Sequence, residues 1–103
     1  MIRVSVFYPA GDGRTFNMDY YLKTHIPLFK KCMGAAMKEV RVERGVGGAT
    51  PGTPAIYVAI AHATFDSAEA FGAALAPHAA EIMGDVPNYT NIQPVIQISE
   101  VLM

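Results

Sequence analysis

The run AIYVAIAHATF, residues 55–65, is the most strand-like stretch of the chain. It is rich in β-branched and aromatic residues, and a Gly/Pro/Thr loop at residues 46–54 precedes it. Both of its alternating faces are largely apolar, with Ile56, Val58 and Ile60 on one and Tyr57, Ala59, Ala61 and Phe65 on the other. A strand covered on one side only should alternate apolar and polar residues. The run therefore predicts a strand with cover on both faces.

Three further strands and two helices surround this run. Alternating apolar residues predict strands at residues 2–8, 38–45 and 92–102. Apolar residues at helical spacing predict helices over residues 18–34 and from Asp66 to Gly84.

The elements follow one another as strand–helix–strand, twice over. This order predicts an α+β, ferredoxin-like βαββαβ domain that spans residues 1–103. Its four-stranded antiparallel sheet would be covered by the two helices on one face. Because the last strand is also apolar on both sides, we expect the open face to meet the same face of a second copy. The expected assembly is a homodimer through the sheet faces.

Composition limits the class of protein. The chain has 103 residues, of which 51% are hydrophobic and 17% charged, and a net charge of −1, as is typical of one small soluble domain. No segment is apolar for long enough to span a membrane, and the N-terminus does not read as a signal peptide. The single cysteine, Cys32, favours a reducing, cytoplasmic setting. The balanced charge offers no excess of basic residues that would favour nucleic-acid binding.

The first helix contains an unusual histidine–proline pair. Asn17 is placed to cap the helix, and Gly34 to end it. Leu22 and Phe29 are expected to anchor it to the sheet. Pro27 cannot donate a backbone hydrogen bond and crowds the preceding turn, so the helix should kink or restart beside His25.

The second helix repeats this feature. Asp66 is placed to cap it, with Glu69 three residues later in a capping-box spacing. Pro77 should bend it directly before His78, as Pro27 does near His25 in the first helix. Each bend can either fit a helix around a small core or open space between helix and sheet.

His25 and His78 are the candidate catalytic residues. Both lie on helix stripes that should face the sheet, so they are expected to border one cavity. Histidine is the usual proton-transfer residue in such a site. The alternative is that each is a core histidine with satisfied hydrogen bonds.

Other residues are candidates for substrate binding in the same apolar cavity. Tyr21 lies one helical turn from His25, and Phe29 shares its stripe. Tyr89 and Asn91 lead into the last strand. Gln97 lies on that strand, where it would either line a polar part of the cavity or face solvent or the dimer seam.

No metal site is expected. The chain has no short HxH or HExxH spacing. Cys32 lies seven residues beyond His25, roughly 10 Å along the helix axis, which is too far for a nucleophile–base pair. Cys32 is therefore interpreted as a core thiol.

Several segments together resemble the EthD family of the dimeric α+β barrel superfamily. They are MIRVSVFYP, MDYYLKTHIPL, VERG, PAIYVAI, FDSAEAF, APHAAEIMGDVPNYT and PVIQISEV, in register over nearly the whole chain. The resemblance implies a ferredoxin-like monomer that pairs sheet to sheet. It also implies an accessory role in degradation of ethyl tert-butyl ether. The family's recurrent histidine matches His25, and further recurrent polar positions match His78 and Tyr89.

Three functions remain open at this point. The first is a cofactor-free enzyme, oxidoreductase- or isomerase-like, that acts on a small apolar organic molecule by histidine-assisted acid–base or oxidative chemistry. The second is a non-catalytic carrier with the same cavity. The third, suggested by heme-binding relatives in the superfamily, is a heme protein with His25 or His78 as the axial ligand.

Overall fold

A single four-stranded sheet, with strands in the order β2-β3-β1-β4, forms one layer of the structure. The structure is a computed structural model that describes residues 1–103. The strands are β1 (Ile2–Pro9), β2 (Met37–Arg44), β3 (Tyr57–Phe65) and β4 (Val95–Glu100). All three neighbouring pairs are antiparallel. The α+β, ferredoxin-like fold predicted from the order of elements is confirmed.

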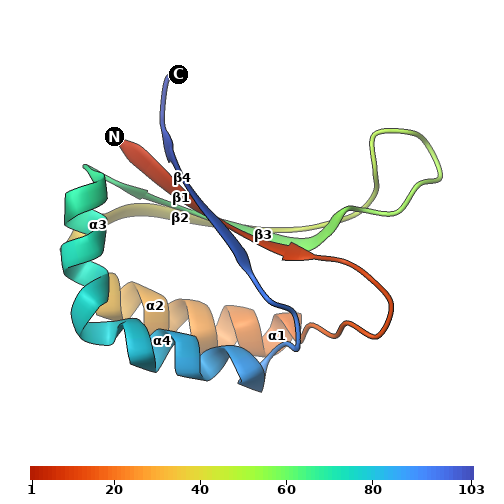
Figure 1. The fold of residues 1–103 in the computed structure, drawn as a ribbon, viewed down its shortest axis with the longest axis horizontal. Helices are drawn as coiled ribbons and strands as arrows, with labels where there is room; N and C mark the ends of the chain where they lie inside the picture. Colours follow the sequence, from red (N-terminus) through yellow and green to blue (C-terminus); the bar gives the residue numbers. More distant parts are fainter.

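The helices form the second layer, on one side of the sheet (Figure 1). The first helical segment comprises α1 (Met18–Tyr20), a π-helical turn (Tyr21–His25) and α2 (Ile26–Met33). The second comprises α3 (Ala68–Leu75), a 3-10 turn (Ala76–His78), α4 (Ala79–Asp85) and a final 3-10 turn (Val86–Asn88). In Figure 1, α2 and α4 lie side by side beneath the sheet, and α3 stands at one end of them.

The π-helical turn is the local response to Pro27. The N–H of Ile26 donates to the carbonyl of Tyr21, five residues earlier, instead of to Leu22. The helix then restarts with Pro27 in its first turn, where a missing N–H costs nothing. The restart predicted beside His25 is thus present. Such π turns occur frequently at functional sites.

The extra residue in this turn also changes which side chains face the sheet. Leu22, expected as an anchor, is 47% exposed, whereas Ile26 and Met33 are buried. The prediction for Leu22 was wrong because it assumed an uninterrupted period of 3.6 residues. Gly34 ends the helix as predicted, with a φ of 57° that favours glycine.

The second helical segment breaks at Pro77, as predicted. The 3-10 turn that contains Pro77 separates α3 from α4 and lets their axes diverge (Figure 1). The N-cap of α3 is Ser67, whose side chain accepts a hydrogen bond from the N–H of Ala70. The predicted N-cap, Asp66, was wrong. Asp66 lies one residue too early, and its carboxylate lies 3.7 Å from the Lys38 ammonium instead.

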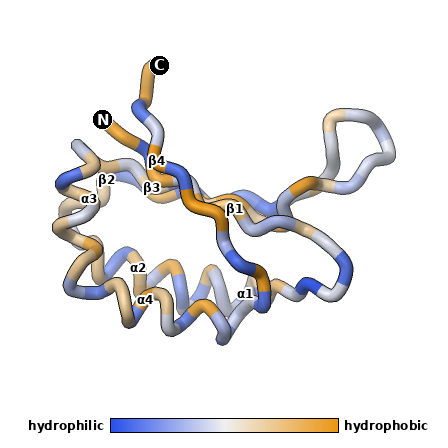
Figure 2. Tube along the Cα trace, viewed as in Figure 1, coloured by the Kyte–Doolittle hydropathy of each residue, from blue (hydrophilic) through white to orange (hydrophobic).

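The two faces of β3 differ in size and burial. Alanines at 59, 61 and 63, followed by Phe65, are buried on the side that faces the helices. The side chains between them, from Val58 to Thr64, are half-buried on the outer face. In Figure 2, hydrophobic residues stand out at the start of β4, whereas the helices alternate hydrophobic and hydrophilic turns. No helix of the structure is long and apolar enough to cross a membrane.

Candidate functional site

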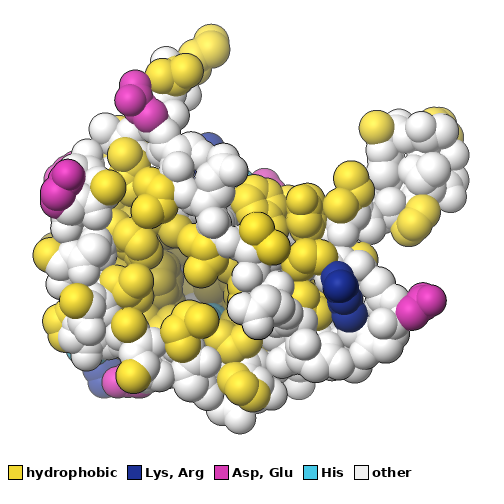
Figure 3. Space-filling model, in the orientation of Figure 1, with side chains coloured by type: hydrophobic (Ala, Val, Ile, Leu, Met, Phe, Trp, Pro, Cys, Tyr) yellow, Lys and Arg dark blue, Asp and Glu magenta, His cyan; other side chains and the backbone are white.

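A cavity of about 100 Å³ lies between the sheet and the helices. Figure 3 shows the hollow from the side of β4, with predominantly hydrophobic side chains around it. Of its 18 lining residues, 16 are hydrophobic. The lining comprises Val4, Val6, Tyr8, Tyr21, His25, Ile26, Phe29, Val40, Ala61, Ala63, Phe71, Leu75, Ile82, Met83, Val86, Tyr89, Pro94 and Ile96.

The sequence of β3 explains why this space is open. Val4 of β1 pairs with Ala63, and Val6 pairs with Ala61, so small alanines stand where larger residues would fill a core. Interiors normally pack with few voids larger than a water molecule. The small side chains of Ala61 and Ala63 therefore account for the cavity.

His25 is the one imidazole in the cavity wall, and it is only 6% exposed. Its Nδ1 lies 2.9 Å from Oδ2 of Asp85, at the end of α4. The Asp85 side chain is itself 12% exposed. Because a carboxylate can only accept, Nδ1 carries the proton and donates it to Asp85. This bond fixes the ring and leaves Nε2 as the nitrogen that can take up a proton.

Asp85 is held ionised by three donors. Tyr20 Oη donates to its Oδ1 at 2.6 Å, and Asn88 Nδ2 donates to the same oxygen at 2.9 Å. Burial opposes ionisation, but the hydrogen bonds from Tyr20, Asn88 and His25 outweigh it, and the pKa of Asp85 lies below its usual value. A carboxylate in this state stabilises a protonated imidazole.

Two tyrosine hydroxyls continue the chain of contacts on the other side of the ring. Tyr89 Oη lies 3.4 Å from Nε2 of His25, a long contact, and 2.8 Å from Oη of Tyr8. Burial raises the pKa of both phenols well above the usual value. They therefore stay neutral and serve as hydrogen-bond donors, which leaves His25 as the proton acceptor of the cavity.

Four of the predicted site residues come together in this cavity. His25, Tyr21, Phe29 and Tyr89 all line it. The rings of Tyr21 and His25 stack with centroids 5.4 Å apart, as the spacing of one turn suggested. The residues missed at the sequence level are Asp85, Tyr8 and Tyr20.

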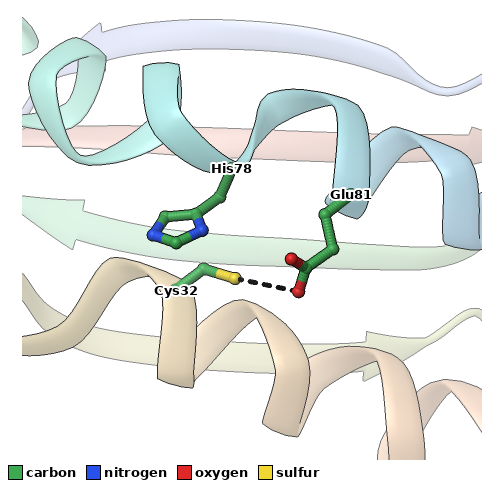
Figure 4. A group of neighbouring side chains, drawn as sticks. All are labelled: Cys32, His78 and Glu81. Atoms are coloured by element: carbon green, nitrogen blue, oxygen red, sulfur yellow. Dashed lines mark hydrogen bonds between the residues drawn. The ribbon is translucent and has the colours of Figure 1, made fainter.

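The three other predicted site residues lie elsewhere. His78 lies near Cys32 and Glu81 and does not line the cavity, so the expectation that it borders one cavity with His25 was wrong. The break at Pro77 turns its side chain toward α2 instead (Figure 4).

Asn91 and Gln97 are also outside the cavity. The Asn91 side chain accepts from Thr15 N at 2.8 Å and donates to the carbonyl of Gly13 at 2.9 Å. It thus ties the loop before α1 to the segment that carries Tyr89. Gln97 pairs with Ser5 in the sheet and is exposed on the outer face, where it donates to Ser99. This is the alternative that its sequence position left open.

Comparison with known proteins points to one family. The EthD domain model matches residues 14–93. An EthD-like protein from Ralstonia eutropha JMP134 has 45% identity and a TM-score of 0.95, over 99% of this chain and 92% of the other. No curated protein matches the chain.

Two more distant structures share the fold. An ethyl tert-butyl ether degradation (EthD) family protein from Bacillus halodurans C-125 has 16% identity and a TM-score of 0.68, over 99% of both chains. A dimeric ferredoxin-like protein of unknown function from Thermobifida fusca YX has 16% identity and a TM-score of 0.60, over 97% of this chain and 90% of the other.

Proposed function

Because this chain belongs to the EthD family, we propose that it is an enzyme that removes a proton from a small, mostly apolar organic molecule. The proposal rests on one observation. A histidine oriented by an ionised carboxylate, with two neutral tyrosine hydroxyls beside it, is placed in the wall of an otherwise apolar cavity. Proton transfer to a positioned imidazole typically contributes 10²–10⁴-fold to a rate, so about this much is assigned to His25.

The proposed reaction uses three groups. The substrate proton passes to Nε2 of His25, and the resulting imidazolium is stabilised by the Asp85 carboxylate across the Nδ1 bond. The electron pair left on the substrate delocalises onto an oxygen. The Tyr89 hydroxyl, backed by Tyr8, is the donor nearest to that developing charge.

The cavity limits the substrate class. About 100 Å³ accommodates a molecule up to roughly the size of benzene. Imidazole can deprotonate an enol, a phenol or a carbon next to a carbonyl group, but an ether such as ethyl tert-butyl ether offers it no acidic proton. We therefore propose that, in the degradation of such ethers, this protein acts after the ether has been cleaved, on a carbonyl or hydroxyl compound.

The same deprotonation is the first step of isomerisation and of cofactor-free oxygenation. In the first case the proton returns to another atom of the substrate, and in the second the anion reacts with O₂. Oxygen uptake that accompanies turnover distinguishes the second from the first.

Hydrogen–deuterium exchange tests proton removal without knowledge of the natural substrate. Cyclopentanone is small enough for the cavity, and NMR in D₂O follows loss of its α-protons. We expect the protein to accelerate exchange, and His25→Gln, which keeps a hydrogen-bonding side chain beside Asp85, to lower the rate by about 10²–10⁴-fold. His78→Gln, at a histidine outside the cavity and away from the outer sheet face, is the matched control. Undiminished exchange in His25→Gln would refute the assignment of the base.

A carrier function is the second candidate, and the apolar lining favours it. A carrier binds benzene without catalysing exchange of cyclopentanone. Ala61→Val, which fills part of the cavity, should weaken benzene binding in either case. Benzene affinity together with cyclopentanone exchange no faster than free imidazole produces would replace the enzyme proposal with the carrier.

Heme has no role in this proposal. The cavity of about 100 Å³ is far smaller than a porphyrin, and both nitrogens of His25 already face partners. His78 lies outside the cavity. Absence of a Soret shift when heme is added to the purified protein is the expected result.

We also propose that two copies pair through their outer sheet faces. Phe7 pairs with Ile60 on one side and Val95 on the other, which makes an apolar row across three strands. This row lies opposite the cavity face, since Val6 and Tyr8 line the cavity. The dimeric structure from Thermobifida fusca supports the pairing by analogy of fold. Native mass spectrometry should report a dimer for the wild type and for Leu22→Asp, and a monomer for Phe7→Asp.

A further inference from the structure

A second cluster of reactive side chains lies at the seam between α2 and α4. Cys32 comes from the last turn of α2, His78 from the end of the 3-10 turn before α4, and Glu81 from the first turn of α4 (Figure 4). One donor atom of each residue lies within 4.8 Å of the other two. The Cys32 thiol donates a weak hydrogen bond to Glu81 Oε1 at 3.8 Å. In Figure 4 the three side chains point toward one another, with the strands behind the helices.

The spacing of the donor atoms fits a tetrahedral ion. Zinc bonds of about 2.3 Å to sulfur and about 2.0–2.2 Å to nitrogen or oxygen place neighbouring ligand atoms roughly 3.3–3.6 Å apart. The observed donors lie within 4.8 Å of one another, so they must approach by up to about 1.5 Å to reach that spacing. His78 and Glu81 are three residues apart on one helical face, so they can close on an ion from the same side.

The chemistry of the donors also favours zinc. A thiolate and an imidazole are ligands that Mg²⁺ and Ca²⁺ avoid and Zn²⁺ accepts. Glu81 takes part in none of the ion pairs of the structure, so its carboxylate is not committed to a lysine or arginine. Cys32 and His78 are half-buried and Glu81 is exposed, which leaves a path for the ion from solvent.

We propose that Cys32, His78 and Glu81 bind one zinc ion, with water in the fourth position. Binding forms Zn–S, Zn–N and Zn–O bonds and releases the thiol proton to solvent, so affinity should rise with pH. The ion would join α2 to α4 at the end opposite His25 and Asp85. The proposal stands apart from the proposed reaction, because none of the three residues lines the cavity.

Cobalt substitution tests the site directly. The untagged full chain, stripped with EDTA and kept reduced, is titrated with Co²⁺. We expect one equivalent to bind, with a thiolate-to-cobalt charge-transfer band and the strong visible bands of tetrahedral Co²⁺, and Zn²⁺ to displace it. Cys32→Ser should abolish the charge-transfer band. His78→Gln and Glu81→Gln should weaken Zn²⁺ binding by at least about 10–100-fold, the loss expected even for supporting residues of a metal site.

Controls separate this site from adventitious binding. His62→Gln removes a histidine outside the cluster and should leave both the spectrum and the stoichiometry unchanged. Zn²⁺ should raise the melting temperature of the wild type and not that of Cys32→Ser. The proposal is overturned if about micromolar Co²⁺ produces no thiolate band. It is equally overturned if Cys32→Ser binds Zn²⁺ as tightly as the wild type.

Discussion

The two ends of the α2–α4 pair each join the helices through a histidine, in opposite environments. At one end, His25 bonds to Asp85 beside the cavity; we call this the buried junction. At the other end, His78 meets Cys32 and Glu81 on the outer side of the helices; we call this the open junction. The same residue type is thus fixed by a 2.9 Å hydrogen bond in a buried place and left half-exposed in the other.

The difference shows how the surroundings set the chemistry of a histidine. At the buried junction, Asp85 is held ionised by Tyr20 and Asn88, so the His25 ring has one tautomer, with the proton on Nδ1. At the open junction, burial and the neighbouring Glu81 carboxylate raise the pKa of the Cys32 thiol. That thiol stays protonated until a cation replaces its proton. The buried junction therefore suits the proposed proton transfer, and the open one the proposed zinc site.

The largest expected effect concerns the charge at the buried junction. Asp85→Asn keeps the shape but removes the negative charge and leaves one acceptor oxygen for the three donors Tyr20, Asn88 and His25, so we expect cyclopentanone exchange to fall about 10²-fold. The free energy of unfolding should also fall by about 1–3 kcal/mol, because buried donors lose their partner. Exchange by NMR and urea denaturation measure the two effects. Glu69→Gln, an exposed acid at the start of α3, is the control, and equal rates in Asp85→Asn and wild type would contradict the prediction.

The tyrosines should differ in their contribution to stability. Tyr89→Phe removes the hydroxyl that contacts both Tyr8 and His25, so two buried groups lose a partner, at a cost of about 1–3 kcal/mol. Tyr8→Phe removes only one bond and should cost about 1 kcal/mol. Urea denaturation of the single and double variants gives the coupling between them. A larger loss in Tyr8→Phe would show that the chain of contacts does not run through Tyr89.

Acidification should weaken the buried junction. The pKa of Asp85 lies below its usual value in the folded protein, so its stabilising contribution is complete above the unfolded pKa of 3.8 and is lost as the pH falls through the folded value. The difference in stability between wild type and Asp85→Asn should therefore shrink on acidification. Urea denaturation at several pH values from about 6 down to about 2, a range that covers the interval below 3.8, checks it. A stability difference that stays constant with pH would show that folding does not lower the pKa of Asp85.

The smallest effect is expected at the open junction without metal. Glu81→Gln in the EDTA-stripped protein should change the free energy of unfolding by less than about 0.5 kcal/mol, since the side chain is exposed and forms no ion pair. With Zn²⁺ added, the wild type should become the more stable of the two. A large loss without metal would mean that the open junction is a structural contact in its own right.

The sequence predicts the fold well because its periodicities are local. Alternation and helical spacing place all four strands and both helical segments, and the two prolines predict where the helices restart. The predicted ends of the elements are less accurate, since the last strand begins at Val95 and not at residue 92. No local pattern reports that the segment after Tyr89 first crosses to the loop before α1, where Thr90 bridges Phe16.

The candidate site is only half visible in the sequence. His25 and Tyr21 share one turn of helix, so their proximity can be predicted from spacing alone. Asp85 lies 60 residues from His25, just beyond Gly84, where the predicted second helix ends. Tyr8 was interpreted only as a strand residue. Their roles depend on how α4 packs against α2 and β1, which single-sequence periodicity does not encode. The same holds for the 49 residues that separate Cys32 from Glu81.

The π-helical turn at Tyr21–His25 has a consequence for how members of this family can diverge. Loss of a single codon in this turn, for example that of Thr24, would restore an ordinary α-helical turn and leave the helix intact. Each residue rotates an α-helix by about 100°, so the part that carries Tyr21 would turn relative to the part that carries His25. Their ring stacking would be lost while the fold survived. One in-frame deletion thus offers a route from the proposed catalyst to a passive binder on the same scaffold.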